Sequence, residues 1–279
     1  MKKVPALISL LILAGVYSIA QETRIVPTFE EVLSLKMAGT PFISPDGTDI
    51  LFTVTQTDWK ENRTDTEIWI SRDGADPFQL TNNPSSGSSS PQWSPDGRWI
   101  AFSSDRGTKS QVYVMHSEGG EAFPVTRTKD GITGFEWSPD SKTIAFTTLA
   151  EESLKEREER YGKYAVEDEE YRLSVLKLID FNPELLGAFP LPCYENDSAR
   201  KEEFCFQYPE EQTLAGNKEY TVTGFKWSPD GKMIVFDHQP DPLINSFSKS
   251  DISIFYTDTK KIEQLVRNTG SDGFTDWSP

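Results

Sequence analysis

The chain contains few of the side chains that carry nucleophilic or metal chemistry. It has two histidines, His116 and His238, and two cysteines, Cys193 and Cys205, too few for a zinc framework or a disulfide-rich scaffold. No G-x-S-x-G nucleophile elbow occurs, and residues 87–90 form a Ser-rich connection. Neither histidine has a matching nucleophile, so we expect both to be ordinary surface or blade-edge residues. The sequence predicts no catalytic residue, no metal site and no cofactor.

The two cysteines lie twelve residues apart. In an exported protein, a disulfide between Cys193 and Cys205 would close a surface loop and stabilise the fold by roughly 3 kcal/mol on loop-entropy arithmetic. Two free thiols are the alternative.

A dense acidic segment lies between residues 151 and 171. It has nine acidic and four basic residues, several of them spaced as i, i+4 ion pairs, which predicts a protruding helix. Its candidate binding carboxylates are Glu156, Glu158, Glu159, Glu167, Asp168, Glu169 and Glu170. A solvated helix with internal ion pairs is the competing interpretation.

Composition and charge restrict the class of protein. The chain of 279 residues has Lys+Arg 28 and Asp+Glu 44, a formal net charge of −16, which disfavours binding to nucleic acids and anionic membranes. Hydrophobic residues make up 36% and aromatic residues 12%, so large rings are concentrated in a polar chain. That combination favours an all-β fold of short strands.

The first twenty residues have the pattern of a signal peptide. Lys2 and Lys3 precede an apolar run of 15 residues, 6–20, which ends in Ser18-Ile19-Ala20. The run is shorter than the roughly 20 residues of a spanning helix, so a membrane anchor is the weaker alternative. We expect cleavage after Ala20 and export to a periplasm or beyond, with no membrane association afterwards.

One turn signature recurs along the chain at corresponding positions. The string Ser-Pro-Asp-(Gly/Ser), preceded by Ile or Trp, is followed by Ile at five and Phe at seven residues after Pro in four copies. The repeat residues are Ser44, Pro45, Asp46, Gly47, Trp93, Ser94, Pro95, Asp96, Gly97, Trp137, Ser138, Pro139, Asp140, Trp227, Ser228, Pro229, Asp230, Gly231 and Trp277.

Each copy has the features of a β-hairpin. Pro and Asp favour a type I turn, and Gly accepts the left-handed conformation that returns the chain. The second strands, near residues 50–52, 99–102, 143–146 and 233–236, are continuously apolar, which predicts burial on both faces. With third and fourth strands following, each copy is one blade of a β-propeller: about four full blades and the start of a fifth.

The interval from Pro139 to Pro229 is longer than the others and predicts insertions in the third blade. We expect a signal peptide at 1–20, an N-terminal segment with a short helix at 21–40, and a partial propeller at 41–279. The insertions fall at about 149–172, which is helical, and 190–220. Strand 173–180 continues the blade between them.

Several segments resemble the propeller domain of prolyl oligopeptidase family serine peptidases, especially the dipeptidyl aminopeptidase and acylaminoacyl-peptidase branch. They are TFEEVLSLK at 28–36, which has a capping-box spacing, PFISPDG at 41–47, VEDEEYR at 166–172 and YTVTGFKW at 220–227. The likeness covers nearly all of residues 25–279. The turn repeat is less specific, because TolB-like propellers share it.

The resemblance implies that the chemistry belongs to a C-terminal α/β-hydrolase domain, absent here, so we expect a fragment of a longer peptidase. In relatives the propeller restricts access to short peptides, and an acidic insertion can contact the substrate's amino terminus. The acidic candidates above are the local match. Gln92, Glu136, Lys226 and Asp276, on the innermost strands, are expected either to reach the central channel or to form hydrogen bonds between blades.

Three functions follow. The first is the substrate-gating propeller of an exported serine exopeptidase. The second is a TolB-like periplasmic scaffold that binds proteins, and the third is a free-standing propeller that binds peptides or glycans. A downstream hydrolase domain with a G-x-S-x-G elbow would select the first.

Overall fold

The computed structural model describes residues 26–84, 86–106, 109–151, 158–159, 162, 171–186, 191–193, 203–205, 208–216, 219–266 and 268–278. The chain divides into two compact units, Met1–Leu35 and Lys36–Pro279. The predicted signal peptide at 1–20 lies outside the described residues, as does most of the predicted acidic helix. In the described parts of the chain, no helix is long and apolar enough to cross a membrane.

The first unit contains the short helix α2 (Phe29–Leu33). Its first turn has the capping box that the sequence predicts: Glu31 N donates to Thr28 Oγ1 at 3.2 Å, and Thr28 N donates to Glu31 Oε2 at 2.8 Å. These bonds satisfy two backbone N–H groups that a helix start leaves without intrahelical partners.

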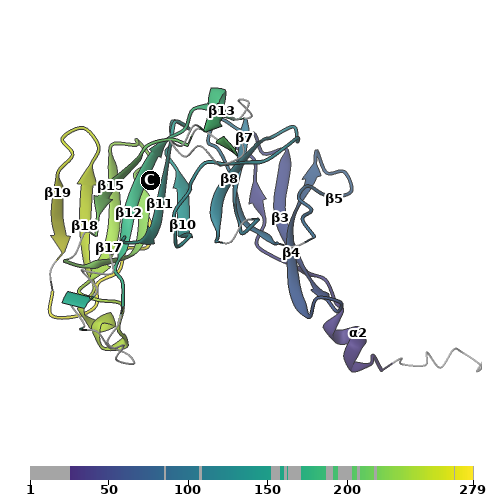
Figure 1. Cartoon of the computed structure of the whole chain (residues 1–279), viewed down its shortest axis with the longest axis horizontal. Helices are drawn as coiled ribbons and strands as arrows, with labels where there is room; N and C mark the ends of the chain where they lie inside the picture. Colours follow the sequence, from purple (N-terminus) through teal and green to yellow (C-terminus); the bar gives the residue numbers. More distant parts are fainter. Residues whose placement is uncertain are drawn as a thin grey trace, which may run out of the picture. The chain divides into compact units, whose positions relative to one another are not determined.

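The second unit consists of antiparallel sheets that follow one another along the sequence (Figure 1). Blade 1 contains β1 (Met37–Ala38), β2 (Phe42–Ile43), β3 (Asp49–Asp58), β4 (Arg63–Arg72) and β5 (Phe78–Gln79). Blade 2 contains β6 (Ser88–Trp93), β7 (Trp99–Ser104), β8 (Gln111–His116) and β9 (Phe123–Pro124). Blade 3 contains β10 (Ile132–Trp137), β11 (Thr143–Leu149), β12 (Ser174–Asp180) and β15 (Glu211–Ala215). Blade 4 contains β16 (Thr221–Trp227), β17 (Met233–Gln239), β18 (Asp251–Tyr256) and β19 (Ile262–Val266).

This order confirms the predicted all-β propeller: blades 2, 3 and 4 are four-stranded, and blade 1 has a fifth strand because β1 and β2 both pair with β3. Within blade 3, Trp137 pairs with Ile144 and Phe135 with Phe146, as the hairpin prediction requires. Residues 274–277 were expected to start a fifth blade. Phe274 and Trp277 pack against blade 4, and no strand is assigned to the described residues 268–278.

The repeated turns owe their sequence to one hydrogen-bond pattern. The turn Ser donates to the Asp two residues later, at 2.5 Å for Ser44, 2.6 Å for Ser94 and Ser138, and 2.7 Å for Ser228. In all four turns the same hydroxyl accepts the N–H five residues later at 2.9 Å. The Asp accepts the N–H two residues later at 3.1 Å. All four serines are buried, so their hydroxyls need these partners.

The core lies between successive blades. Ala101, Val112 and Val114 of blade 2 pack against Ile144 and Phe146 of blade 3. The predicted burial of the second strands on both faces is confirmed in blades 2, 3 and 4, where the repeat Ile and Phe residues are 0% exposed.

Blade 1 differs from that prediction. Leu51 is buried, but Ile50 is 39% exposed, and the prediction of burial on both faces is wrong for this strand. Successive residues of a strand point to opposite faces. The Leu51 face packs against blade 2, whereas no sheet of the described residues covers the face that carries Ile50.

The fourth strand of blade 3 also differs from the prediction. It is β15, which lies inside the range 190–220 that was assigned to an insertion, so this insertion ends before Glu211. The strand EQTLA has few apolar residues, and its sequence signal is correspondingly weak.

The pair β13 (Leu191–Cys193) and β14 (Glu203–Cys205) forms a separate small hairpin. Its register places Cys193 opposite Glu203 and Cys205 opposite Leu191. The side chains of both cysteines lie outside the described parts of the structure, so the disulfide stays a prediction.

Candidate functional site

The innermost strands of the four blades line a groove of about 700 Å³. Aromatic rings from different blades contribute to its wall, namely Phe42, Trp93, Phe135 and Phe225. Thr133, Thr147 and Thr223 add hydroxyl groups. We call this the inner groove. Aromatic faces combined with a few polar groups are typical of a binding surface for a small or extended ligand.

One position on each inner strand, three residues before the turn Pro, differs from blade to blade. It is Phe42 in blade 1, Gln92 in blade 2, Glu136 in blade 3 and Lys226 in blade 4, and Asp276 follows before Pro279. The residues that follow it, Ile or Trp and then Ser-Pro, are repeated. Variation at a fixed position allows each blade to present different chemistry on the same backbone.

Gln92 and Glu136 connect neighbouring blades, which was one of the two alternatives from the sequence, and Lys226 pairs with the segment that follows blade 4. Gln92 Nε2 donates to the carbonyl oxygen of Phe135 at 2.8 Å. Glu136 Oε2 accepts a hydrogen bond of 3.0 Å from Trp227 N. Lys226 Nζ lies 3.5 Å from Asp276 Oδ1. Gln92 and Glu136 also line the inner groove, so the two alternatives are compatible for them.

Burial controls the electrostatics of the inner carboxylates. It raises the pKa of Glu136 above its ordinary value, and the Trp227 N–H and the Lys226 charge oppose this effect. Burial likewise raises the pKa of Asp237, opposed by a hydrogen bond of 2.9 Å from Phe274 N. A carboxylate with reduced hydration gains more from pairing with a cation than one in bulk water does.

The inner strands contain bulges that the sequence analysis missed. The pairing register shifts between Ile132 and Gly134 in β10, and between Val222 and Gly224 in β16. Both bulges belong to a Thr-Gly-Phe-x-Trp string at 133–137 and 223–227, which was the available signal. Glycine in a strand often marks a bulge or a close approach of another group. Both glycines line the inner groove.

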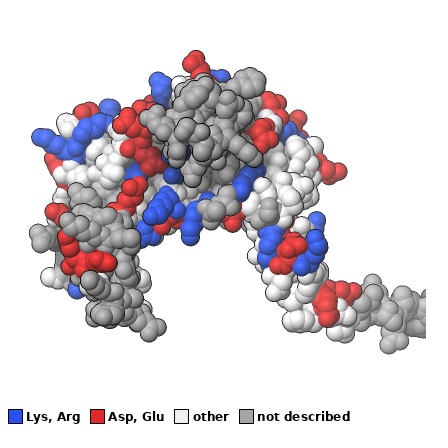
Figure 2. All heavy atoms as spheres, in the orientation of Figure 1, with Lys and Arg blue, Asp and Glu red and all other residues white. Residues whose placement is uncertain are grey.

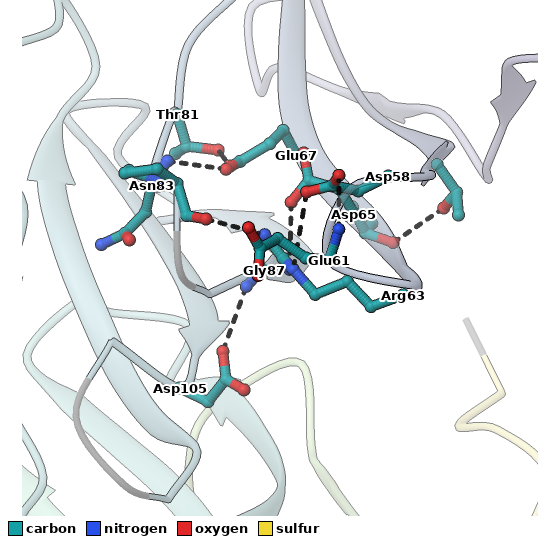
Figure 3. A network of polar contacts seen from close by, with 12 residues as sticks. Asp58, Glu61, Arg63, Asp65, Glu67, Thr81, Asn83, Gly87 and Asp105 are labelled. Atoms are coloured by element: carbon teal, nitrogen blue, oxygen red, sulfur yellow. Dashed lines mark hydrogen bonds and ion pairs between the residues drawn. The ribbon is translucent and has the colours of Figure 1, made fainter.

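A second polar cluster lies around Glu67 at the junction of blades 1 and 2 (Figure 3). Glu67 Oε2 accepts from Thr81 Oγ1 at 2.5 Å, and Oε1 accepts from Asn83 N at 2.8 Å. Nearby, Arg63 pairs with Asp65 at 3.4 Å. Buried acids beside an arginine can indicate a site, so the cluster needs an explanation.

The same arrangement recurs in blade 2 without a charge. Gln111 Oε1 accepts from Thr126 Oγ1 at 2.8 Å and from Thr128 N at 3.1 Å. The neutral Gln111 amide accepts the equivalent hydrogen bonds in blade 2. The Glu67 cluster is therefore explained by a structural role, which is to hold the fourth strand of the blade to the third. Among the described residues, no group of three or more His, Cys, Asp or Glu side chains is placed to hold a metal.

His238 has a hydroxyl neighbour that the sequence did not indicate. His238 Nε2 lies 2.8 Å from Ser253 Oγ. However, Ser253 is 3% exposed, and the His238 ring lies in a tilted contact with Tyr220, with ring centroids 4.4 Å apart. A substrate carbonyl has no approach to this hydroxyl, so the pair gives no catalytic site. His116 is exposed and lies in an edge-to-face contact with Trp99.

The acidic candidates are described in part. Glu158 and Glu159 are exposed with helical backbone, and Gly162 N donates to the Glu158 carbonyl oxygen at 2.9 Å. Glu156, Glu167, Asp168, Glu169 and Glu170 lie outside the described residues. Arg172, which follows them, forms a two-bond ion pair with Asp130 at 2.6 and 2.7 Å. Among the described residues on the face in Figure 2, acidic and basic side chains are interspersed.

Fold and sequence together define a propeller protein built from a repeated Ser-Pro-Asp turn. A family model described as the TolB beta propeller domain matches residues 22–164, and the chain belongs to this family.

The chain is also similar to peptidases. It is 32% identical over 107 residues to the uncharacterized peptidase YuxL of Bacillus subtilis (strain 168), a match that covers 38% of this chain and 16% of YuxL. The chain therefore matches a small part of that relative's length.

Two solved structures share the fold. The acylaminoacyl peptidase of Pyrococcus horikoshii is 17% identical with a TM-score of 0.54, covering 87% of this chain and 34% of that chain. An oligogalacturonate lyase in complex with manganese is 14% identical with a TM-score of 0.53, covering 87% and 55%. A peptidase and a lyase thus share this architecture, so the fold by itself does not define an activity.

Proposed function

We propose that this chain is the substrate-gating, non-catalytic propeller portion of an exported serine exopeptidase that acts on short peptides. The similarity to YuxL supports the peptidase class. A C-terminal α/β-hydrolase domain of the same parent polypeptide would supply the nucleophile and the rest of the catalytic triad.

The observation that carries the proposal is the set of hydrogen bonds that join neighbouring blades along the inner groove. Gln92 on β6 donates to β10, Trp93 Nε1 donates to the Phe42 carbonyl oxygen at 3.2 Å, and β16 donates to Glu136. Hydrogen bonds between blades resist widening of the groove. A groove held at fixed width admits an extended peptide and excludes a folded protein.

Carboxylates suit the amino-terminal end of an exopeptidase substrate, because they pair with its ammonium group and leave no room for a longer chain. Glu136 in the inner groove and the acidic insertion, with Glu167, Asp168, Glu169 and Glu170, are the proposed sources of that charge.

Length selectivity of the full-length polypeptide tests the gating. We expect the ratio of kcat/KM for a dipeptidyl chromogenic substrate to that for an unfolded peptide of about thirty residues to fall in Gln92→Ala, because a loosened groove admits longer chains. Gln264→Ala, on the exposed edge strand β19, is the matched control. An unchanged ratio in Gln92→Ala would refute gating by the inner groove.

Export is part of the proposal and has its own test. Amino-terminal sequencing of the protein recovered from the periplasm or medium should begin at Gln21. Recovery of the intact amino terminus from the cytoplasm would contradict it.

A TolB-like scaffold is the second candidate, favoured by the family match over residues 22–164. This candidate predicts that the chain binds envelope proteins stably and that Gln92→Ala changes no peptidase activity.

A further inference from the structure

A cavity of about 380 Å³ lies between the Ser-Pro-Asp turns of blades 1 and 2. We call it the turn cavity. Blade 1 contributes Asp49 and Arg72 to its wall, and blade 2 contributes Trp93 and Ser117. It adjoins the inner groove, because Pro45 and Trp93 line both. Its volume lies within the range of sites that bind small molecules.

At the junction of blades 2 and 3, the equivalent place is filled by aromatic rings. Phe181 contacts Trp99 of blade 2 and Trp137 of blade 3, with ring centroids 5.4 and 4.9 Å away. His116 lies edge-to-face with Trp99 at 5.2 Å. Phe181 is 8% exposed, so its ring is an integral part of the packing between these two blades.

Ser117 of blade 2 is the counterpart of Phe181. It follows the third strand β8 as Phe181 follows the third strand β12. Their backbone bonds also correspond: Ser117 N donates to the Arg98 carbonyl oxygen at 2.9 Å, and Phe181 N donates to the Lys142 carbonyl oxygen at 2.7 Å. A small side chain therefore stands in blade 2 where blade 3 has a phenyl ring, and the turn cavity occupies the space of that ring.

The remaining walls of the turn cavity are one aromatic ring and one ion pair. Trp93, the counterpart of Trp137, precedes the turn Ser of blade 2. Asp49 and Arg72 pair across β3 and β4, where blade 2 pairs two aromatic residues. Arg72 Nη1 lies 2.8 Å from Asp49 Oδ2, and Arg72 Nη2 donates to the Ser117 carbonyl oxygen. A guanidinium held in this way can lie against an aromatic ring.

The charge of the turn cavity favours a cation. Asp46 and Asp96, which also line it, use Oδ1 for the hydrogen bonds of their turns. Among the described residues, no hydrogen bond or ion pair reaches their Oδ2 atoms or the carboxylate of Glu118, the next lining residue. These three carboxylates and Asp49 outnumber the guanidinium of Arg72, so the wall attracts a cationic ligand and repels an anionic one.

We propose that the turn cavity binds a small aromatic amine. The ring of the ligand takes the place that Phe181 occupies at the next junction, against Trp93. Its ammonium group pairs with the free carboxylate oxygens of Asp46, Asp96 and Glu118. This site goes beyond the proposed peptidase function and does not depend on it, because every residue that forms it belongs to blades 1 and 2.

An NMR titration of the purified chain, observed on the ligand, tests the proposal. We expect 2-phenylethylamine to bind with a dissociation constant on the order of 1 mM. The matched anion 3-phenylpropionate should bind at least about fivefold more weakly, because the wall is negative. Ser117→Phe supplies the missing ring from the chain itself and should abolish binding of the amine. Ser117→Ala, which leaves the cavity open, is the matched control and should retain it.

Glu118→Lys gives a second test at an exposed position, which decides the question if Ser117→Phe does not fold. It should weaken binding of the amine by about threefold and leave the fold unchanged by circular dichroism. Absence of binding by the amine, or equal binding of the amine and the anion, would overturn the proposal. Unchanged binding in folded Ser117→Phe or in Glu118→Lys would also overturn it. None of these measurements involves peptidase activity, so their outcome is separate from that of the gating proposal.

Discussion

Carboxylates at the blade turns and carboxylates on the inner strands differ in their electrostatics. At the exposed turns, hydrogen bonds from Ser44 and Ser228 lower the pKa of Asp46 and Asp230. On blades 3 and 4, burial raises the pKa of Glu136 and Asp237. The same functional group is stabilised as an anion in one region and penalised in the other.

This difference in pKa distinguishes carboxylates with a structural role from a carboxylate that is a candidate for binding. The turn Asp recurs in each repeat with the same hydrogen bonds, so its role is to hold the hairpin. Glu136 occupies a position where other blades have Phe42, Gln92 or Lys226, and no repeated geometry requires a carboxylate there. A partly buried charge that is not repeated is the better candidate for ligand recognition.

Removal of a turn hydroxyl should give the largest effect on stability. Ser138 is buried, donates to Asp140 at 2.6 Å and accepts from Thr143 N at 2.9 Å. Ser138→Ala leaves both partners without this hydroxyl and should lower the free energy of unfolding by about 1–3 kcal/mol, measured by urea denaturation. Ser271→Ala, at an exposed position, should change it by less than about 0.5 kcal/mol. Equal effects of both substitutions would show that the turn network is dispensable.

The pH dependence of stability should have opposite signs in the two regions. The native pKa of Glu136 is raised from 4.5, so the native state retains its proton better and this group's contribution to stability falls as pH rises above that value. Glu136→Gln should therefore gain stability relative to the unsubstituted protein as pH rises from acid to neutral.

Asp140 gives the matched comparison at the neighbouring turn. Burial opposes the shift, but hydrogen bonds from Ser138 and Lys142 N outweigh it and lower the pKa of Asp140 below 3.8. Its stabilising contribution is present above that value and is lost as pH falls. Asp140→Asn should be less stable than the unsubstituted protein near neutral pH, with the difference shrinking in acid. Parallel pH profiles for the two variants would contradict the contrast between the regions.

The smallest effect is expected at Ser141, which stands where the other three turns have Gly. Its φ of 60° is unfavourable for a residue with a side chain, while its hydroxyl accepts a hydrogen bond of 3.0 Å from Asp96 N in blade 2. Ser141→Gly relieves the backbone strain but loses the hydrogen bond from Asp96 N, so the two contributions to stability nearly cancel. Thermal denaturation should show a change of about 0.5 kcal/mol or less. A large loss would mean that the contact between these turns dominates.

The repeated turns made the fold accessible from sequence. The residue types at Ser138, Pro139 and Asp140 define a local hydrogen-bond pattern, and the burial of the strand that follows depends on its own apolar residues. Such local signals need no knowledge of the rest of the chain. For this reason the repeated hairpins, the succession of blades and the capping box at Thr28 were predicted correctly.

Features that depend on distant partners were not predicted. The contact of His238 with Ser253 arises from the pairing of β17 and β18, and the equivalence of Glu67 and Gln111 becomes visible once the fourth strands are placed. The exposure of Ile50 depends on which blade lies beside it, which its own sequence does not encode. The polar strand β15 gave too weak a pattern to locate.

The central claim, that this propeller belongs to a serine peptidase and is itself non-catalytic, is tested most directly by a serine-reactive fluorophosphonate probe combined with a dipeptidyl chromogenic substrate. The account predicts that the longest polypeptide from the gene is labelled and hydrolyses the substrate, while purified residues 21–279 do neither. Hydrolysis by residues 21–279 that the probe abolishes, or a longest polypeptide that the probe leaves unlabelled, would contradict it.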